Sequence, residues 1–489
     1  ARRRSYASVS ADPRDGRSVV LTIDQTVQYF AERALQSALA QNPATSATAI
    51  VLEPRTGEIL ALANSPTFDP NEAKTVTPEL RKNHALQDIY EPGSTFKVVA
   101  FSAALEERLA KPDDKIDCQM GSITVAGRRI RDHTAYGTLT MTEALAKSSN
   151  VAAIKLGLRV GDERMFDYIT RFGFGAKTGV ELPGETRGLL RAVARWQKSS
   201  IGSIAIGQEI GVTPLQVASA FAAIANDGVR VAPHLVKEVR GADGAVVSGT
   251  QAESRRVVSA ETARTVRGML ETVTVRGTAK RARLEGYTAA GKTGTAQKID
   301  PNTGAYSKTK HVASFVGFAP VENPAVVIIV VVNEPRGAYH GGDAAAPIFR
   351  DIAEQVLPYL NVMPDAELTP EQAAEAERLL ARNAATGGSP GVHDERNQPP
   401  PPAQSGGPSV AARHVEGAGE VVFAEAGARA LLMPDLRGRS VREAMNVCTQ
   451  LGLKLEARGD GGRASQQSPA AGESVEPGQV VRVEFGRSD

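Results

Sequence analysis

Three short motifs in this chain carry residues that could form and break an acyl bond. In the first, EPGSTFK at 91–97, a Pro-Gly turn places a serine at the start of an apolar helix. Residues three apart on a helix share a face, so Lys97 can lie beside the Ser94 hydroxyl. We therefore predict that Ser94 is a nucleophile and that Lys97 is its base.

Ser-x-x-Lys is a common spacing, and the chain has a second copy at Ser307 and Lys310. The turn residues 301–304 precede that copy, so we expect it in a hairpin loop. Only at Ser94 does the pattern predict a helix that holds both side chains on one face, with the hydroxyl at the positive end of the helix dipole. The sequence therefore favours Ser94 over Ser307.

A Lys-Thr-Gly motif also occurs twice, at 177–179 and at 292–294. The first copy lies in a turn-rich segment, and we interpret it as structural. The second copy is flanked by strand-like sequence, and small residues on a sheet edge let a peptide approach the backbone closely. The functional residues that we predict on this strand are Lys292, Thr293, Gly294 and Thr295.

The weakest motif is SSN at 148–150, because serine and asparagine at a helix end are ordinary capping residues. Thr140 and Glu143 have the form of a capping box, which predicts a short helix leading to Ser148 and Asn150. Together the three motifs supply a nucleophile pair, a hydroxyl-amide pair and a cation on a strand. A serine acyl transferase requires these parts.

The elements that must position these motifs follow from the hydrophobic pattern. Strand-like runs occur near both ends of the first 360 residues, and helical patterns lie between them. This order indicates one α/β unit. Its sheet should join an N-terminal hairpin to the late strands. The predicted strands are 47–53, 58–64, 288–299, 312–319 and 326–333. The predicted helices begin at Asp24, Ser94, Thr140 and Thr213 and cover 259–274 and 344–360.

The composition and net charge of the chain limit the functions it can have. A chain of 489 residues with 42% hydrophobic residues and a formal net charge of +2 is globular and has no strong attraction to nucleic acid, so we expect no nucleic-acid partner. Cys118 and Cys448 have no neighbours at metal-ligand spacing, and we expect no disulfide, metal or other cofactor. The longest apolar run, 325–332, is too short to span a membrane and predicts a buried strand.

The composition changes after Leu360. We expect an exposed helix over 369–382 and a linker over 386–410, which is rich in Gly, Pro, Ser and Gln. A compact pattern resumes near Met433, with a helix at 441–451, which would bury Cys448, and a last strand at 480–485. The expected regions are a remnant of a preceding region at 1–20, a main domain at 21–362, a partly disordered linker at 363–430 and a small domain at 431–487.

On these motifs the chain resembles the penicillin-binding proteins, specifically the monofunctional class B D,D-transpeptidases of the division type. Matching phrases also lie at 21–24, 56–61, 66–71 and 202–214. The resemblance implies an α/β fold like that of serine β-lactamases, with an antiparallel five-stranded sheet flanked by helices and an all-helical subdomain. Residues 433–485 resemble one small α+β PASTA module, which implies either peptidoglycan recognition or a docking appendage.

The resemblance also implies a role for each residue of the three motifs. Ser94 would attack the penultimate D-Ala carbonyl of a peptidoglycan stem peptide, and Lys97 would take its proton. Ser148 would relay a proton to the leaving amine, and Asn150 would hold the substrate amide and help to position Lys97.

On the strand, Lys292 would support Ser148 electrostatically, and Thr293 and Thr295 would meet the terminal carboxylate. Backbone N–H groups of Ser94 and Thr295 would form the oxyanion hole. We predict a depressed pKa for Lys97, caused by Lys292 and by burial.

The implied partners are stem peptides ending in D-Ala-D-Ala, β-lactam antibiotics, a membrane glycosyltransferase and the division or elongation machinery. The resemblance also implies a membrane anchor and pedestal before residue 1, with the site on the extracytoplasmic face of the cell membrane.

Two alternative functions stay open. One is a β-lactamase, although 181–198 contains no Glu with a nearby Asn of the β-lactamase type. The other is a non-catalytic or weakly catalytic sensor of β-lactams or muropeptides.

Overall fold

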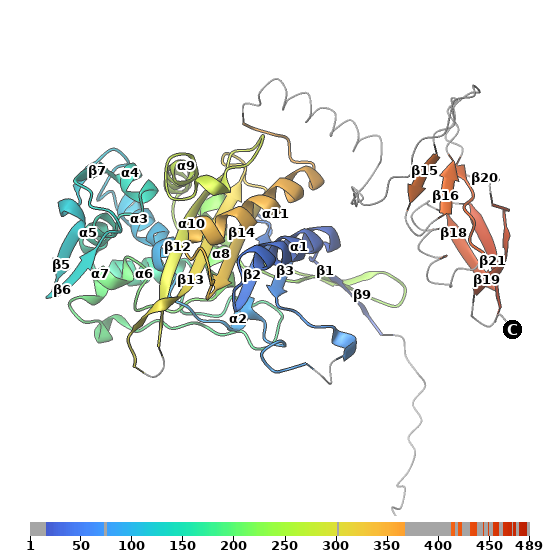
Figure 1. Ribbon diagram of the computed structural model, residues 1–489, viewed down its shortest axis with the longest axis horizontal. Coiled ribbons are helices and arrows are strands. Elements are labelled where there is room, and N and C mark those ends of the chain that lie inside the picture. Colours follow the sequence, from blue (N-terminus) through green and yellow to red (C-terminus); the bar gives the residue numbers. More distant parts are fainter. Residues whose placement is uncertain are drawn as a thin grey trace, which may run out of the picture. The chain divides into compact units, whose positions relative to one another are not determined.

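The computed structural model describes residues 16–72, 76–300 and 303–366, together with parts of 412–486. Contacts divide the chain into two compact units, Ala1–Pro390 and Gly391–Asp489 (Figure 1). The finer boundaries at 20, 362 and 430 remain predictions. The expected helix at 369–382 and the expected linker at 386–410 lie outside the described residues.

The first unit is organised around an antiparallel sheet of five strands in the order β12-β13-β14-β2-β3. The hairpin of β2 and β3 joins the late strands through the pairing of β2 with β14. The predicted α/β fold and its sheet are thus confirmed. The strands are β2 (Ser46–Leu52), β3 (Ile59–Ser65), β12 (Ala290–Ile299), β13 (Tyr306–Ala319) and β14 (Val326–Asn333).

Helices cover the sheet, which explains why every residue of β14 except its last is buried (Figure 1). Helices α1 (Gln25–Gln41) and α11 (Ala346–Tyr359) pack against each other and against the sheet, and α8 (Pro214–Ala225) packs against β2, β13 and β14. Phe349 of α11 meets Phe315 of β13 edge-on, with ring centroids 4.8 Å apart. These aromatic contacts fix α11 to the sheet.

Most of the remaining helices of this unit form a second region beside β12, which is an edge strand of the sheet. Helix α9 packs against β12, α3 and α4, so it links the helical region to the sheet. The capping box predicted at Thr140 is present, and a second capping box begins α8 at Thr213. The helices are α3 (Lys97–Glu106), α4 (Met141–Ala146), α5 (Asn150–Val160), α6 (Asp162–Arg171), α7 (Ser200–Ile204) and α9 (Ala260–Val275).

One expectation about boundaries was wrong. Strand β13 begins at Tyr306, which pairs with Ile299, so Ser307 and Lys310 lie in a strand and not in a hairpin loop. The closing helix was predicted to within two residues, because α11 runs from Ala346 to Tyr359. A short helix, α10 (Gly341–Ala344), precedes it.

In the second unit, three strands form a sheet in the order β18-β21-β19, and β18 is parallel to β21. The last strand was predicted correctly, and Cys448 lies in the buried cluster of this unit as expected. The strands are β18 (Lys454–Arg458), β19 (Arg463–Ser468) and β21 (Val480–Gly486).

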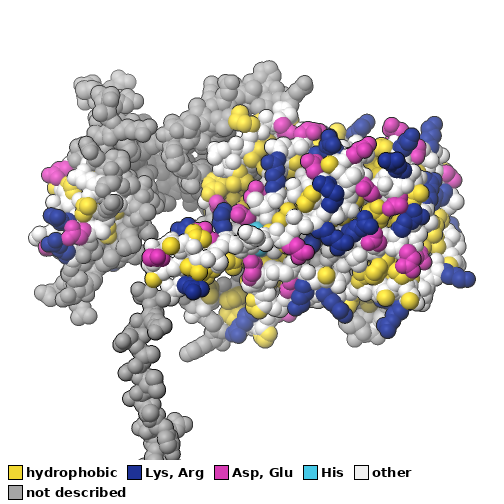
Figure 2. Space-filling view, turned by 180° about the vertical axis from the view of Figure 1, so that it is seen from behind, with side chains coloured by type: hydrophobic (Ala, Val, Ile, Leu, Met, Phe, Trp, Pro, Cys, Tyr) yellow, Lys and Arg dark blue, Asp and Glu magenta, His cyan; other side chains and the backbone are white. Residues whose placement is uncertain are grey.

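The surface of the described part carries charges of both signs side by side, and Figure 2 shows them mixed across one face. Mixed charge of this kind fits the small net charge and the expectation of no nucleic-acid partner. Among the described residues, no helix has both the length and the apolar character needed to cross a membrane.

Replacing Phe349 tests how α11 is fixed to the sheet. Phe349→Ala should lower the free energy of unfolding by about 3–5 kcal/mol, because it leaves a cavity against Phe315. The matched control, Tyr29→Ala on the exposed side of α1, should change stability by less than about 1 kcal/mol. Denaturant unfolding followed by circular dichroism measures both, and equal losses in the two variants would contradict this packing.

Candidate active site

A cleft of about 590 Å³ lies where β12, the turn before α3 and the junction between α4 and α5 meet. The structure brings all eight predicted site residues to this place. Five of them line the cleft, namely Ser94, Ser148, Asn150, Thr293 and Thr295. The other three are buried behind its wall, namely Lys97, Lys292 and Gly294.

Ser94 lies on a 3-10 turn, Gly93–Phe96, and α3 begins only at Lys97. This differs from the α-helix predicted to carry both residues. In a 3-10 turn, residues three apart lie almost above one another, so Ser94 and Lys97 still share a side. Among the described residues the Ser94 hydroxyl makes no hydrogen bond, so it is available to a substrate in the cleft.

Neighbouring backbone packs tightly around the Ser94 turn. The Gly93 N–H donates to the Gly207 carbonyl at 3.1 Å, and a Cβ at Gly207 would lie 2.2 Å from the Gly93 oxygen. A Cβ at Gly294 would lie 3.0 Å from the Pro92 oxygen. The same Cβ would lie 2.4 Å from the Ser314 Oγ, so Gly294 is required by close packing on both sides. Its role in substrate approach remains a prediction.

Both lysines of the site contact one hydroxyl. The Lys292 Nζ lies 2.9 Å from the Ser148 Oγ, and the Lys97 Nζ lies 3.2 Å from the same atom. Lys97 also donates to the Ser148 carbonyl at 2.5 Å and to the Asn150 Oδ1 at 2.7 Å. Ser148 has a left-handed backbone, with φ +58°, which is uncommon for a residue with a side chain. This conformation presents its carbonyl and its hydroxyl to Lys97 together.

Burial lowers the pKa of Lys97 to about 7, because the buried ammonium group loses its hydration. The direction of our prediction and the contribution of burial are confirmed. The pKa of Lys292 is also lowered well below its usual value, by burial and then by the charge of Lys97. The two buried amines therefore disfavour each other's ammonium form.

Asp132 is a residue of the site that the sequence analysis missed. Its carboxylate accepts hydrogen bonds from the Ser149 hydroxyl at 2.8 Å, from the Asn150 N–H and from the Val151 N–H at 3.0 Å. It thus holds the first turn of α5, where a carboxylate is favourable, and fixes Asn150. Its charge also opposes the lowering of the Lys97 pKa. No local pattern marks Asp132, because it lies on a separate segment that follows β6 (Arg128–Arg131).

Polar groups from further segments complete the cleft, and the sequence analysis missed these as well. The Thr278 Oγ1 lies 2.7 Å from the Thr293 Oγ1, and the Gly341 N–H donates to the Thr295 Oγ1 at 3.1 Å. His133 and His340 line the opening, with ring centroids 5.4 Å apart. Burial, followed by the nearby His133, lowers the His340 pKa.

The two duplicate motifs lie outside the cleft. Thr178 donates to Glu185 through both its N–H and its hydroxyl, at 2.6 Å each, while Lys177 is exposed. The Ser307 hydroxyl accepts from the Lys310 N–H at 3.1 Å within β13. Neither copy contributes a residue to the lining of the cleft.

The link between Asp132 and Lys97 can be tested without a substrate. In Asp132→Asn, the pKa of Lys97 should fall further below about 7, because the carboxylate charge that favours the ammonium form is gone. An NMR titration of isotope-labelled lysine side chains measures this value. Asp117→Asn, next to Lys155 and outside the cleft, should leave it unchanged. A raised Lys97 pKa in Asp132→Asn would contradict the assignment.

Comparison with known families gives two matches. The model described as the penicillin binding protein transpeptidase domain matches residues 47–354, and the PASTA domain model matches residues 432–487. Penicillin-binding protein PbpB of Mycolicibacterium smegmatis is 40% identical over 363 residues, which cover 72% of this chain and 56% of that protein. Stage V sporulation protein D of Bacillus subtilis is 33% identical over 487 residues, covering 98% of this chain and 66% of that protein.

Among solved structures, penicillin binding protein 3 from Mycobacterium tuberculosis, complexed with aztreonam, is similar with a TM-score of 0.69 and 38% identity. The similarity covers 74% of this chain and 83% of that chain. This chain spans roughly half to two thirds of the length of the curated relatives above. The family model matches more than half of the chain, on the residues that carry the cleft. The chain therefore belongs to the penicillin-binding protein transpeptidase family, and it carries a PASTA domain near its C-terminal end.

Proposed function

We propose that this chain is a serine-type D,D-transpeptidase, which cross-links peptidoglycan stem peptides through an acyl-enzyme and is acylated by β-lactams. The observation that carries the proposal is the convergence of Lys97 and Lys292 on the Ser148 hydroxyl, in the same cleft as Ser94. Relatives support it. Probable peptidoglycan D,D-transpeptidase PenA of Neisseria meningitidis serogroup A is 34% identical, covering 73% of this chain and 59% of that protein.

In the first half of the reaction, the Ser94 oxygen attacks the penultimate D-Ala carbonyl and its proton passes to neutral Lys97. A base must be neutral to accept a proton, and a pKa of about 7 provides that form near neutral pH. The tetrahedral intermediate then expels the terminal D-Ala, whose nitrogen receives a proton through the Ser148 hydroxyl. Ser94 is left as an ester of the stem peptide.

A bound substrate would add a negative charge next to the lysine on the strand. The terminal carboxylate of a stem peptide, held by Thr293 and Thr295, would bring a negative charge close to Lys292. A nearby opposite charge raises the pKa of an amine, so a bound substrate would favour the ammonium form of Lys292. In this proposal the N–H groups of Ser94 and Thr295 stabilise the oxyanion.

The cellular setting is also part of the proposal. A transpeptidase of this family would act on the extracytoplasmic face of the cell membrane, attached through segments that precede this chain. Its partners would be a membrane glycosyltransferase that polymerises the glycan strands and the division or elongation machinery. The PASTA domain would contact peptidoglycan or dock a partner.

Two other functions are separated from this proposal by the fate of the acyl group. A β-lactamase would hydrolyse its acyl-enzyme quickly, whereas a sensor would keep it and would not transfer a peptide. The loop after Lys177 contributes no carboxylate to the cleft, because its Glu185 is hydrogen-bonded to Thr178 outside the cleft. This observation favours transfer over hydrolysis.

The nucleophile is tested by covalent labelling. A labelled penicillin should acylate the wild-type protein once, at Ser94, and the adduct should persist because deacylation is slow. Ser94→Ala should abolish the label, whereas Ser307→Ala, on β13, should leave it unchanged. Mass spectrometry of the intact protein and of its peptides measures both site and lifetime. A label that survives in Ser94→Ala would refute the assignment, and rapid antibiotic turnover would favour a β-lactamase.

The pH dependence of acylation tests the role of Lys97. Because the neutral amine is the base, the acylation rate should fall about tenfold for each pH unit below about 7 and level off above it. Stopped-flow measurement with a chromogenic β-lactam between pH 5.5 and 8.5 gives the profile. Circular dichroism at each pH checks that the fold is intact. A flat profile in a folded protein would exclude Lys97 as the titrating base.

A further inference from the structure

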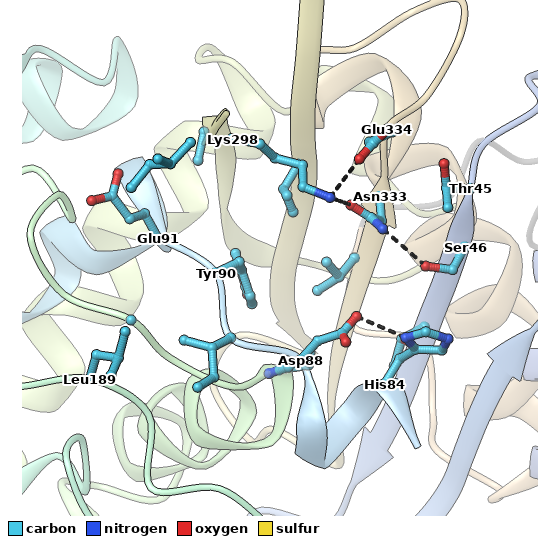
Figure 3. A pocket seen from close by; sticks show the side chains of 18 of the residues that line it. Thr45, Ser46, His84, Asp88, Tyr90, Glu91, Leu189, Lys298, Asn333 and Glu334 are labelled. Carbon is cyan, nitrogen blue, oxygen red and sulfur yellow. Dashed lines mark hydrogen bonds and ion pairs between the residues drawn. The ribbon is translucent and has the colours of Figure 1, made fainter. Parts of the chain in front are cut away.

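Glu91 lies three residues before Ser94, and its carboxylate joins two segments that are distant in the sequence. It accepts a hydrogen bond from the Glu209 N–H at 2.8 Å and one from the Tyr306 hydroxyl at 2.9 Å. Glu91 lines the cleft and also a neighbouring cavity of about 770 Å³, where Figure 3 shows its carboxylate well apart from Lys298. The residue just before the nucleophile turn is thus held from two sides.

The first of these contacts completes an interrupted backbone pairing. Segments 90–93 and 207–212 run antiparallel, and backbone hydrogen bonds of 2.9 to 3.1 Å join them at both ends. Glu209 lies between these bonds and has a left-handed backbone, with φ +60°, which is uncommon for a residue with a side chain. Its N–H is received by the Glu91 carboxylate. The Glu91 side chain therefore joins the two segments where their backbones stop pairing.

The Glu209 side chain anchors this loop to the helical region. It accepts a hydrogen bond from the Ser200 hydroxyl at 2.8 Å and forms ion pairs with Arg128 at 3.2 Å and with Arg191. Burial raises the pKa of Glu91, whereas the hydrogen bonds that it accepts and the charge of Arg128 oppose that rise. The loop that meets the nucleophile segment is therefore fixed to β6, which carries Arg128.

The second contact reaches Glu91 from the sheet. Tyr306 is the first residue of β13 and pairs with Ile299 near the outer end of the hairpin that β12 and β13 form. Both strands are buried at their inner ends and largely exposed at this outer end. Burial, followed by the charge of Glu91, raises the pKa of Tyr306 to about 12, so its hydroxyl keeps its proton near neutral pH. It therefore remains a donor to Glu91.

We propose that Glu91 and Tyr306 are positioning residues, whose hydrogen bond fixes the Ser94 turn relative to β12. The inference rests on the proposed role of Ser94 as nucleophile. The proposed oxyanion donors, the N–H groups of Ser94 and Thr295, lie on these two elements. Such donors stabilise the oxyanion only when they are in place before the charge develops. A looser link should therefore slow acylation more than it weakens the first complex with the ligand.

Deleting one hydroxyl tests the link. Stopped-flow acylation by a chromogenic β-lactam at increasing concentration gives the dissociation constant of the first complex and the acylation rate constant separately. In Tyr306→Phe the rate constant should fall about tenfold, while the dissociation constant changes less than about twofold. Tyr168→Phe is the matched control, because Tyr168 is buried and its hydroxyl donates to Glu107 at 2.8 Å outside the cleft. Both constants of the control should match wild type.

Variants of Glu91 separate its hydrogen bonds from its charge. Glu91→Gln keeps an acceptor oxygen and should stay within about threefold of the wild-type rate constant, whereas Glu91→Ala should lose about tenfold or more. Adding Tyr306→Phe to Glu91→Ala should cause little further loss, because the bond is already gone. Denaturant unfolding checks each variant. The result for Tyr306→Phe decides the question if Glu91→Ala does not fold.

Each outcome has one meaning. If the wild-type protein is not acylated at Ser94, the proposed function fails and the positioning role fails with it. If wild type is acylated and Tyr306→Phe matches Tyr168→Phe, the positioning role is overturned while the proposed function stands. A weaker first complex with an unchanged rate constant would make Tyr306 a binding residue and overturn the proposal. Additive losses in the double variant would also overturn it, because the two residues would then act separately.

Discussion

Two buried lysine side chains share one serine hydroxyl, and this contact constrains the rest of the first unit. An ammonium group removed from water is unfavourable unless acceptors replace the lost hydration. Lys97 obtains three acceptors from Ser148 and Asn150. Two of them come from Ser148 itself, whose left-handed backbone costs on the order of 1–3 kcal/mol. The fold must therefore hold the junction between α4 and α5 firmly.

Both sides of that junction are fixed by polar contacts. The capping box of Thr140 and Glu143 begins α4, and Asp132 binds the first turn of α5. The same Asp132 adds a negative charge near Lys97, so the group that stabilises the helix also influences the protonation of Lys97. Structural support and acid-base chemistry are thus coupled through one carboxylate.

Close backbone packing places the nucleophile against this charged centre. Gly207 and Gly294 carry no side chain at the points where other residues would collide with the Ser94 turn. Since β12 is an edge strand, its outer side also remains open to the cleft. Glu91 precedes this turn and lines the cleft.

From the amino-acid sequence alone we could predict the residue types of the site, the choice of Ser94 over Ser307 and of Lys292 over Lys177, and the pairing of the early hairpin with the late strands. Local spacing, capping patterns and strand periodicity carry these predictions. The meeting of Lys97 and Lys292 at Ser148, the contacts of Asp132 and the close approach of Gly294 to the Ser94 turn became visible only in the fold. Spacing along the chain defines neighbours within one helix or strand, whereas burial, pKa shifts and shared cavities depend on segments that only folding brings together.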